Sequence, residues 1–310
     1  MAMDFWQAQR HARRQTALYL TLFFLLTIVA AILLEFGLRY YGEGQYNPPL
    51  PYFGLTFLAF TLVSASVQYI CYMSMGGKYV AESMGARLAN ASDPKGAQLL
   101  NIVQECAIAA ALPIPKVYII DAEQINAFAA GLDADSAVIA ITRGALEKLS
   151  RDEIQGVIAH EFGHISNGDM VIGLRLAAML MGFYFILYMA IRIMQFSGGN
   201  RDSKGQNPVL FAALFFLIAG SFAWLFGSIL KAAVSRQREY LADATSVQFT
   251  RNPEGLANAL RKIQQEQVKD MPKTGMAYSH LYLDDHGTLS SLFATHPPIK
   301  KRIQAIEGNE

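Results

Sequence analysis

The chain of 310 residues is short of charge and nearly free of cysteine. Charged side chains make up 16% of it, whereas a soluble domain carries about 25%. This balance argues against a disordered or fibrous chain and against an ordinary cytosolic enzyme. The two cysteines, Cys71 and Cys106, allow neither a disulfide framework nor a cysteine-based zinc site, so we expect both to be small buried residues. A net charge of +1 gives no field that attracts nucleic acid, which we exclude as a partner.

The hydrophobic residues, 53% of the chain, gather in four long runs: residues 17–38, 50–75, 171–194 and 208–234. A bilayer core needs about 20 apolar residues in a helix, so all four runs qualify by length. The first run exceeds the apolar part of a signal peptide, about 7–15 residues, and we interpret it as a retained anchor. We therefore expect an α-rich membrane protein with about four transmembrane or membrane-associated helices.

The charges that flank the first run predict its orientation. Arg10, Arg13 and Arg14 precede it, and residues 39–49 contain a single arginine. The positive-inside rule then places the N-terminus in the cytoplasm, and two spans return residues 78–170 to the same side.

The third and fourth runs leave two alternatives open. Their connecting loop, residues 196–207, is weakly positive on the side where the rule disfavours positive charge. The two runs either span the bilayer or form a buried or half-inserted hairpin. Either way they act as a pair, so the chain after residue 234 returns to the side of residues 78–170.

The polar segments predict a small α+β domain. Ser92, Asp93 and Pro94 indicate a helix start, and helical spacing continues to a stop before Pro113. A second, short helix is expected over 143–149. Three β-rich runs are expected as strands of a small antiparallel sheet: residues 116–121, 126–130 and 137–142.

The strongest chemical signal lies on a helix that follows. Ser150 and Glu153 form a capping-box pattern at its start. His160 and His164 are four residues apart, so they share one face and can bind one Zn²⁺. Glu161 lies beside the first histidine, where it can act as general base on a metal-bound water. The alternative is two solvated or core histidines beside an ordinary glutamate.

A catalytic zinc site needs a third ligand. Glu239 and Asp243 also share a helix face, which suits a Glu ligand followed one turn later by an Asp that orients a ligand imidazole. The alternative is a surface helix on which Arg236 and Arg238 pair with these two acids.

Four segments together resemble the HtpX-type integral-membrane zinc metalloproteases, a gluzincin group related to the CAAX prenyl-endopeptidases. The segments are NAFA (126–129), HEFGHISNGDM (160–170), SRQREYLAD (235–243) and FATHPPIKKRI (293–303). The resemblance implies one zinc ion per chain on His160, His164 and Glu239, with Glu161 catalytic, in a zincin-like α+β domain. The polar N-terminal extension is longer than in the best-known members of this family, and its role is left open.

The same resemblance assigns further residues. Asn126, Ala127, Phe128 and Ala129 correspond to an edge strand that binds an extended substrate backbone. His296 is expected either near the zinc, as an oxyanion stabiliser or extra ligand, or as a structural cap. Arg302 is expected to pair with a carboxylate such as Asp243.

These observations predict a four-part chain: a basic flank and two-span anchor (1–76), a first catalytic part (77–170), a hydrophobic hairpin (171–234) and a second catalytic part (235–310). The expected function is a zinc endopeptidase that cleaves membrane or membrane-proximal proteins at the cytoplasmic face of a bacterial plasma membrane. A role in protein quality control is implied by the resemblance. The alternatives are a CAAX-type prenyl-peptide endopeptidase, which four runs disfavour because those enzymes have about seven spans, and a non-catalytic membrane scaffold.

Overall fold

The computed structural model describes residues 5–41, 66, 70, 81–82, 84–131, 133–197, 208–266 and 294–308. Nearly all of the second apolar run lies outside the described residues, as does Cys71. Most of the loop 196–207 also lies outside them, and so do His280 and His286, which the sequence indicates as surface residues.

The chain divides into two compact units. Unit 1 consists of Met1–Ala17, Tyr72–Gly173 and Ala232–Glu310, and unit 2 consists of Leu18–Cys71 and Leu174–Lys231. The boundaries fall inside three long helices that contribute residues to both units: α1 (Phe5–Tyr41), α7 (Asp169–Ser197) and α8 (Pro208–Thr250). The four-part division expected from the sequence stays a prediction.

Unit 1 contains a four-stranded sheet in the order β1-β2-β4-β3. Its strands are β1 (Arg87–Leu88), β2 (Lys116–Ile120), β3 (Ala127–Ala130) and β4 (Val138–Thr142). β3 and β4 are antiparallel as expected, but β2 and β4 are parallel, so the prediction of an antiparallel sheet was wrong. The chain leaves β2 for the outer position of β3 and then turns back, which places β4 beside β2 in the same direction. The alternation of side chains along a strand shows which residues face the core. It does not show which strand lies next to it or in which direction, so the sequence pattern could not predict this order.

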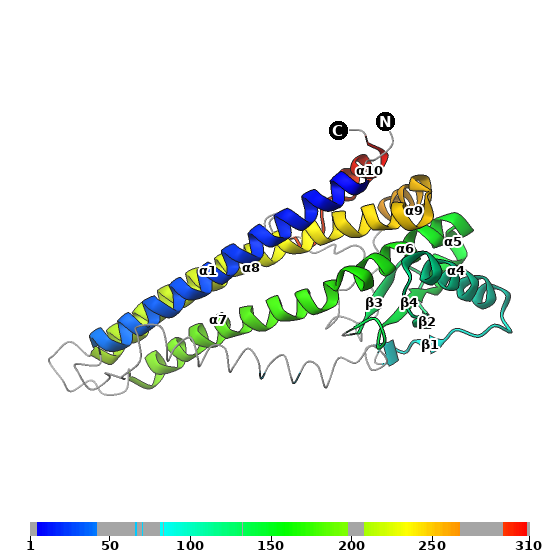
Figure 1. Ribbon diagram of the computed structural model, residues 1–310. Helices are drawn as coiled ribbons and strands as arrows, with labels where there is room; N and C mark the ends of the chain where they lie inside the picture. The colour runs from blue at the N-terminus through cyan, green and yellow to red at the C-terminus, as the bar shows by residue number, and fades with distance from the viewer. Residues whose placement is uncertain are drawn as a thin grey trace. The chain divides into compact units, whose positions relative to one another are not determined.

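Helices pack on the sheet and on one another (Figure 1). They are α4 (Pro94–Ala110), α5 (Arg143–Lys148), α6 (Arg151–Asn167), α9 (Pro253–Gln265) and α10 (Ile299–Glu307). The expected helix starts are confirmed: the Asp93 carboxylate accepts from the Gly96 N–H, and Ser150 with Glu153 forms a complete capping box.

α6 is the central helix of unit 1. It contacts α4, α9 and β3, and its Ile158 and Phe162 are fully buried. Burying one large apolar side chain contributes about 1.5–3 kcal/mol. This packing fixes the position of the helix that carries the two histidines.

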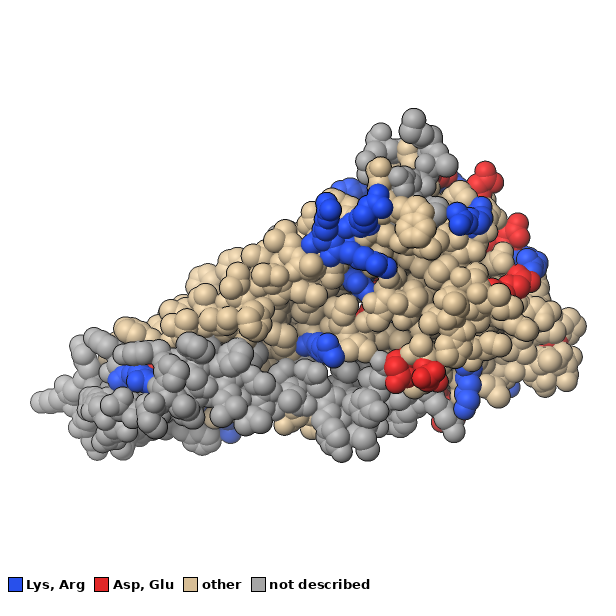
Figure 2. Space-filling view, viewed as in Figure 1, with Lys and Arg blue, Asp and Glu red and all other residues tan. Residues whose placement is uncertain are grey.

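Unit 2 is built from the apolar parts of the long helices. Phe23 of α1 and Phe183 of α7 are buried and stack with ring centroids 5.8 Å apart. Other large side chains face outward, such as Phe222 at 57% exposed. The visible surface over these helices is largely free of charge, and charged side chains gather over unit 1 (Figure 2).

Two of the described helices, over Asp169–Gln195 and Ala213–Thr250, are long and apolar enough to cross a membrane. They correspond to the third and fourth apolar runs. The expected total of about four such helices stays a prediction.

Candidate metal centre

The two histidines of α6 meet α8 where the helices approach closely. Gly163 of α6 faces α8 there, and a Cβ at that position would be 3.0 Å from the Cα of Ala242 in α8. A side chain at 163 would require the facing backbone of α8 to move by a few tenths of an ångström. The close approach brings Glu239 and Asp243 of α8 against the histidine face of α6.

Three side chains converge there. The Nε2 atoms of His160 and His164 are 3.1 Å apart, and each lies 3.6 Å from a carboxylate oxygen of Glu239. Tetrahedral ligands at about 2.0–2.1 Å from Zn²⁺ lie about 3.4 Å from one another. The ligand atoms all fall within 4.8 Å of one another. Two nitrogens and one oxygen at this spacing fit a metal ion such as zinc.

Asp243 lies against the first histidine. Its Oδ1 is 2.9 Å from His160 Nδ1, which leaves Nε2 directed at Glu239. The expected pair with Arg302 is confirmed, since this guanidinium donates to both Asp243 oxygens at 2.9 and 2.7 Å. Burial alone would raise the pKa of Asp243, but Arg302 and His160 hold it below its usual value.

Arg302 also pairs with Glu239, the expected third ligand. Its Nη1 is 3.0 Å from Glu239 Oε2, and its side chain is fully buried. Burial would raise the pKa of Glu239, but His296 and Arg302 hold it well below its usual range. One buried arginine therefore compensates two buried carboxylates, without which either would be costly.

The second histidine has a carboxylate partner that the sequence did not reveal. His164 Nδ1 lies 2.7 Å from Oδ2 of Asp169, the first residue of α7, and Asp169 forms an ion pair with Arg238 of α8. The available signal was Gly168, which ends α6 in a left-handed conformation and changes the direction of the chain.

Glu161 lies between the histidines and β3. Its carboxylate is buried and accepts a hydrogen bond from the Ala129 N–H. Burial raises its pKa, and the carboxylate of Glu239 adds to this, whereas His164 and His160 oppose it. The general base expected from the motif is therefore tied to the strand that contains Ala129.

The segment Asn126–Ala129 lies at the sheet edge. β3 pairs only with β4 among the described strands. Along its outer side the Ala127 N–H donates to the Asn126 side-chain oxygen at 2.8 Å, and the Ala129 N–H donates to Glu161. The structure thus brings the expected substrate strand and the expected base together.

His296 approaches from the chain preceding α10. Its Nδ1 is 3.2 Å from Glu239 Oε1, and its side chain is 14% exposed. The Arg236 guanidinium donates to the carbonyl of Ala294 at 2.7 Å and so holds the segment that contains His296. All expected site residues therefore gather in unit 1.

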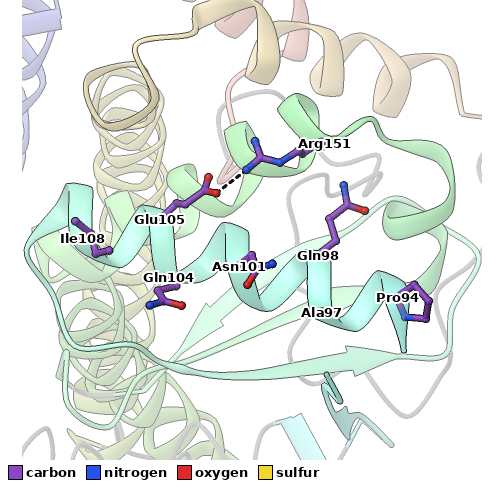
Figure 3. A pocket seen from close by; sticks show the side chains of 8 residues that line it. All are labelled: Pro94, Ala97, Gln98, Asn101, Gln104, Glu105, Ile108 and Arg151. Atoms are coloured by element: carbon purple, nitrogen blue, oxygen red, sulfur yellow. Dashed lines mark hydrogen bonds and ion pairs between the residues drawn. The ribbon is translucent and has the colours of Figure 1, made fainter. Parts of the chain in front are cut away.

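A shallow hollow lies elsewhere, on the surface of α4 (Figure 3). Gln98, Asn101 and Glu105 line it together with Arg151, whose guanidinium pairs with Glu105 at 2.6 Å. None of the expected site residues line it, so it is not the candidate site.

Two histidines one helical turn apart, a buried glutamate beside them and a carboxylate from a later helix are typical of a metallopeptidase centre. Comparison with known proteins agrees, since the model of Peptidase family M48 matches residues 94–310. The chain belongs to this family.

Curated relatives match over nearly the whole length. A protease HtpX homologue of Streptococcus uberis is 34% identical over 98% of this chain and 99% of its own length. Another from Thermoanaerobacter pseudethanolicus is 38% identical over 91% of this chain and 93% of its own. Among solved structures, the crystal structure of S. mikatae Ste24p is similar with 20% identity and a TM-score of 0.48, over 88% of this chain and 61% of that one.

The expected family is thereby confirmed: the chain is a membrane-bound metalloprotease of the HtpX type that acts on proteins or peptides and uses a metal cofactor. This membership removes the non-catalytic scaffold as an alternative. The roles of the individual residues stay predictions.

Proposed function

We propose that the chain is a zinc endopeptidase in which His160, His164 and Glu239 hold one zinc ion. The observation that carries this proposal is the convergence of their three ligand atoms within 4.8 Å. When bound, zinc supplies a Lewis acid that polarises the scissile carbonyl and lowers the pKa of water. Asp243 orients His160, and Arg302 neutralises the buried acids.

Glu161 is proposed as the proton shuttle. The Ala129 N–H fixes its carboxylate on the histidine side of β3, and burial raises its pKa. A raised pKa suits a group that takes a proton from water and releases it to the leaving amine near neutral pH. The strand that fixes the base is also the strand proposed to bind the substrate.

The outer edge of β3 is proposed to pair with an extended substrate backbone along Asn126, Ala127, Phe128 and Ala129. Backbone pairing gives affinity through main-chain hydrogen bonds and selects little for sequence. In this arrangement the substrate replaces the Asn126 side-chain oxygen at the Ala127 N–H. Broad specificity is the expected consequence.

His296 is proposed to act on the substrate carbonyl oxygen. Its imidazole lies beside Glu239 and is only partly exposed. A His296→Phe variant is expected to lose turnover and to keep its zinc. Loss of zinc would instead favour the alternative of an extra ligand.

We propose a multi-pass arrangement in the bacterial plasma membrane with the centre at the cytoplasmic surface. α7 begins five residues after His164, and Glu239 follows Val234 by five residues within α8. These short chain distances favour a site close to the bilayer, and Arg10, Arg13 and Arg14 favour a cytoplasmic N-terminus. Substrates would be membrane or membrane-proximal proteins removed in quality control.

The test compares purified wild-type protein with Glu161→Gln in detergent, with casein and a membrane protein as substrates. We expect one zinc per chain in both proteins and proteolysis only in the wild type. Glu105→Gln, in the hollow on α4, is the matched control and should keep both properties. Normal turnover by Glu161→Gln would contradict the mechanism, and a zinc-free wild type would contradict the metal site.

A further inference from the structure

We propose that Asp169 and Arg238 form a positioning pair that holds His164 for the metal, as Asp243 and Arg302 do for His160. The inference rests on the proposed metal site. It assigns a role to two residues that the resemblance to known proteases left without one.

The pair depends on a break between two helices. Five residues separate His164 from Asp169, which in an unbroken helix would place them about 140° apart around the axis. Gly168 interrupts the helix with a φ of +68°. The Asp169 carboxylate is thereby turned back to His164 Nδ1, at 2.7 Å.

Arg238, on α8, is the second member of the pair. Its guanidinium forms an ion pair with Asp169 and donates to the backbone carbonyl of Asn167. The Asp169 and Arg238 side chains are 9% and 11% exposed, so each would be costly without the other. Because Arg238 directly precedes Glu239, one turn of α8 supplies both the third ligand and the support for the second.

The two histidines are therefore held by the same arrangement. Each Nδ1 faces an aspartate, and each aspartate is paired with an arginine from another helix. A carboxylate at Nδ1 fixes the tautomer in which Nε2 is the metal-binding atom and makes the imidazole more basic. Loss of such a partner commonly weakens metal binding by about 10–100-fold.

The N-terminal extension reaches the same network. Arg13 donates to the Asn167 side chain at 3.4 Å, and Asn167 donates to the carbonyl of Gly163 at 2.7 Å. Gln9 donates to Thr245 and Gln248 of α8. The first residues of α1 therefore contact the end of α6, from which the chain leads into Asp169.

The test measures zinc affinity by competition with a chromophoric chelator, together with the absorption bands of the cobalt-substituted protein and the melting temperature of the metal-depleted protein. Asp169→Ala and the isosteric Asp169→Asn are compared with wild type and with Glu105→Ala, which removes a surface ion pair. We expect Asp169→Ala to weaken zinc binding about 10–100-fold and to shift the cobalt bands, and Asp169→Asn to do so less strongly. Glu105→Ala should match wild type.

A double variant separates positioning from stability. Asp169→Leu with Arg238→Met leaves no uncompensated buried charge, so its melting temperature should recover relative to Asp169→Ala. Its zinc affinity should stay low. Wild-type affinity in Asp169→Ala, or recovery of affinity together with stability in the double variant, would overturn the inference. Failure of the metal site itself is recognised separately, because then the wild type would bind no zinc or His164→Ala would bind it as tightly.

Discussion

Gly163 of α6 and Ala242 of α8 face each other so closely that a Cβ on the glycine would lie 3.0 Å from the alanine Cα and 3.1 Å from its carbonyl oxygen. This contact sets the spacing between the helix that carries His160 and His164 and the helix that carries Glu239. The geometry of the proposed metal centre therefore depends on a residue that is not itself one of the proposed ligands.

Gly163→Ala is expected to push α8 away from α6. Overpacking of this kind costs about 1–3 kcal/mol of unfolding free energy, and zinc affinity should fall because Glu239 moves from the histidines. Gly173→Ala is the matched control: it is also helical, and a Cβ there meets nothing within 4 Å. Chelator competition and thermal unfolding in detergent measure both effects, and equal behaviour of the two variants would refute the spacing argument.

Gly168→Ala should displace Asp169. A left-handed conformation costs a residue with a Cβ about 1–2 kcal/mol, so the chain should relax toward a continuous helix. Gly85 has a similar φ of +71° with open space around it, which makes Gly85→Ala a control with the same backbone penalty. We expect comparable loss of stability in both variants and weaker zinc binding only in Gly168→Ala.

Arg302→Met should destabilise unit 1 strongly. Its removal leaves Asp243 and Glu239 buried without their cation, and breaking a buried pair costs about 3–5 kcal/mol. Arg261→Met removes a guanidinium from a partly exposed pair with Glu307 and should cost under about 1 kcal/mol. The free energies are compared by denaturant titration of the metal-depleted proteins; a small effect of Arg302→Met would show that the acids are solvated.

The Cys106 thiol should be inert in the folded protein. It is 2% exposed, and burial, with the nearby Glu105 carboxylate, raises its pKa to about 12. The thiolate is then about one part in 10,000 at pH 8, and only the thiolate reacts. In a Cys71→Ser background a maleimide reagent should label Cys106 only after unfolding. Rapid labelling of the native protein would contradict this environment.

Local patterns predicted the local structure well. The capping box at Ser150, the start of α4 at Pro94 and the three short strands follow from interactions within a few residues. The pairing of Arg302 with Asp243 was also among the expectations, and the structure confirms it.

What the sequence did not reveal depends on how the chain turns in three dimensions. The parallel pairing of β2 with β4 follows from the path of the chain around β3. Asp169 contacts His164 only because Gly168 breaks the helix, and at a spacing of five residues no helical pattern links the two. The two-residue strand β1 is too short for any alternation to show.

Three side chains from two helices are proposed to form one zinc site, and Glu239 is the proposed ligand that only the fold brings to the other two. The most direct measurement is the zinc content of purified Glu239→Ala by elemental analysis after dialysis, beside wild type and Glu105→Ala. We expect one zinc per chain in the wild type and the control and none in Glu239→Ala, with loss of casein cleavage. A full equivalent of zinc and normal cleavage in Glu239→Ala would show that Glu239 is not a zinc ligand.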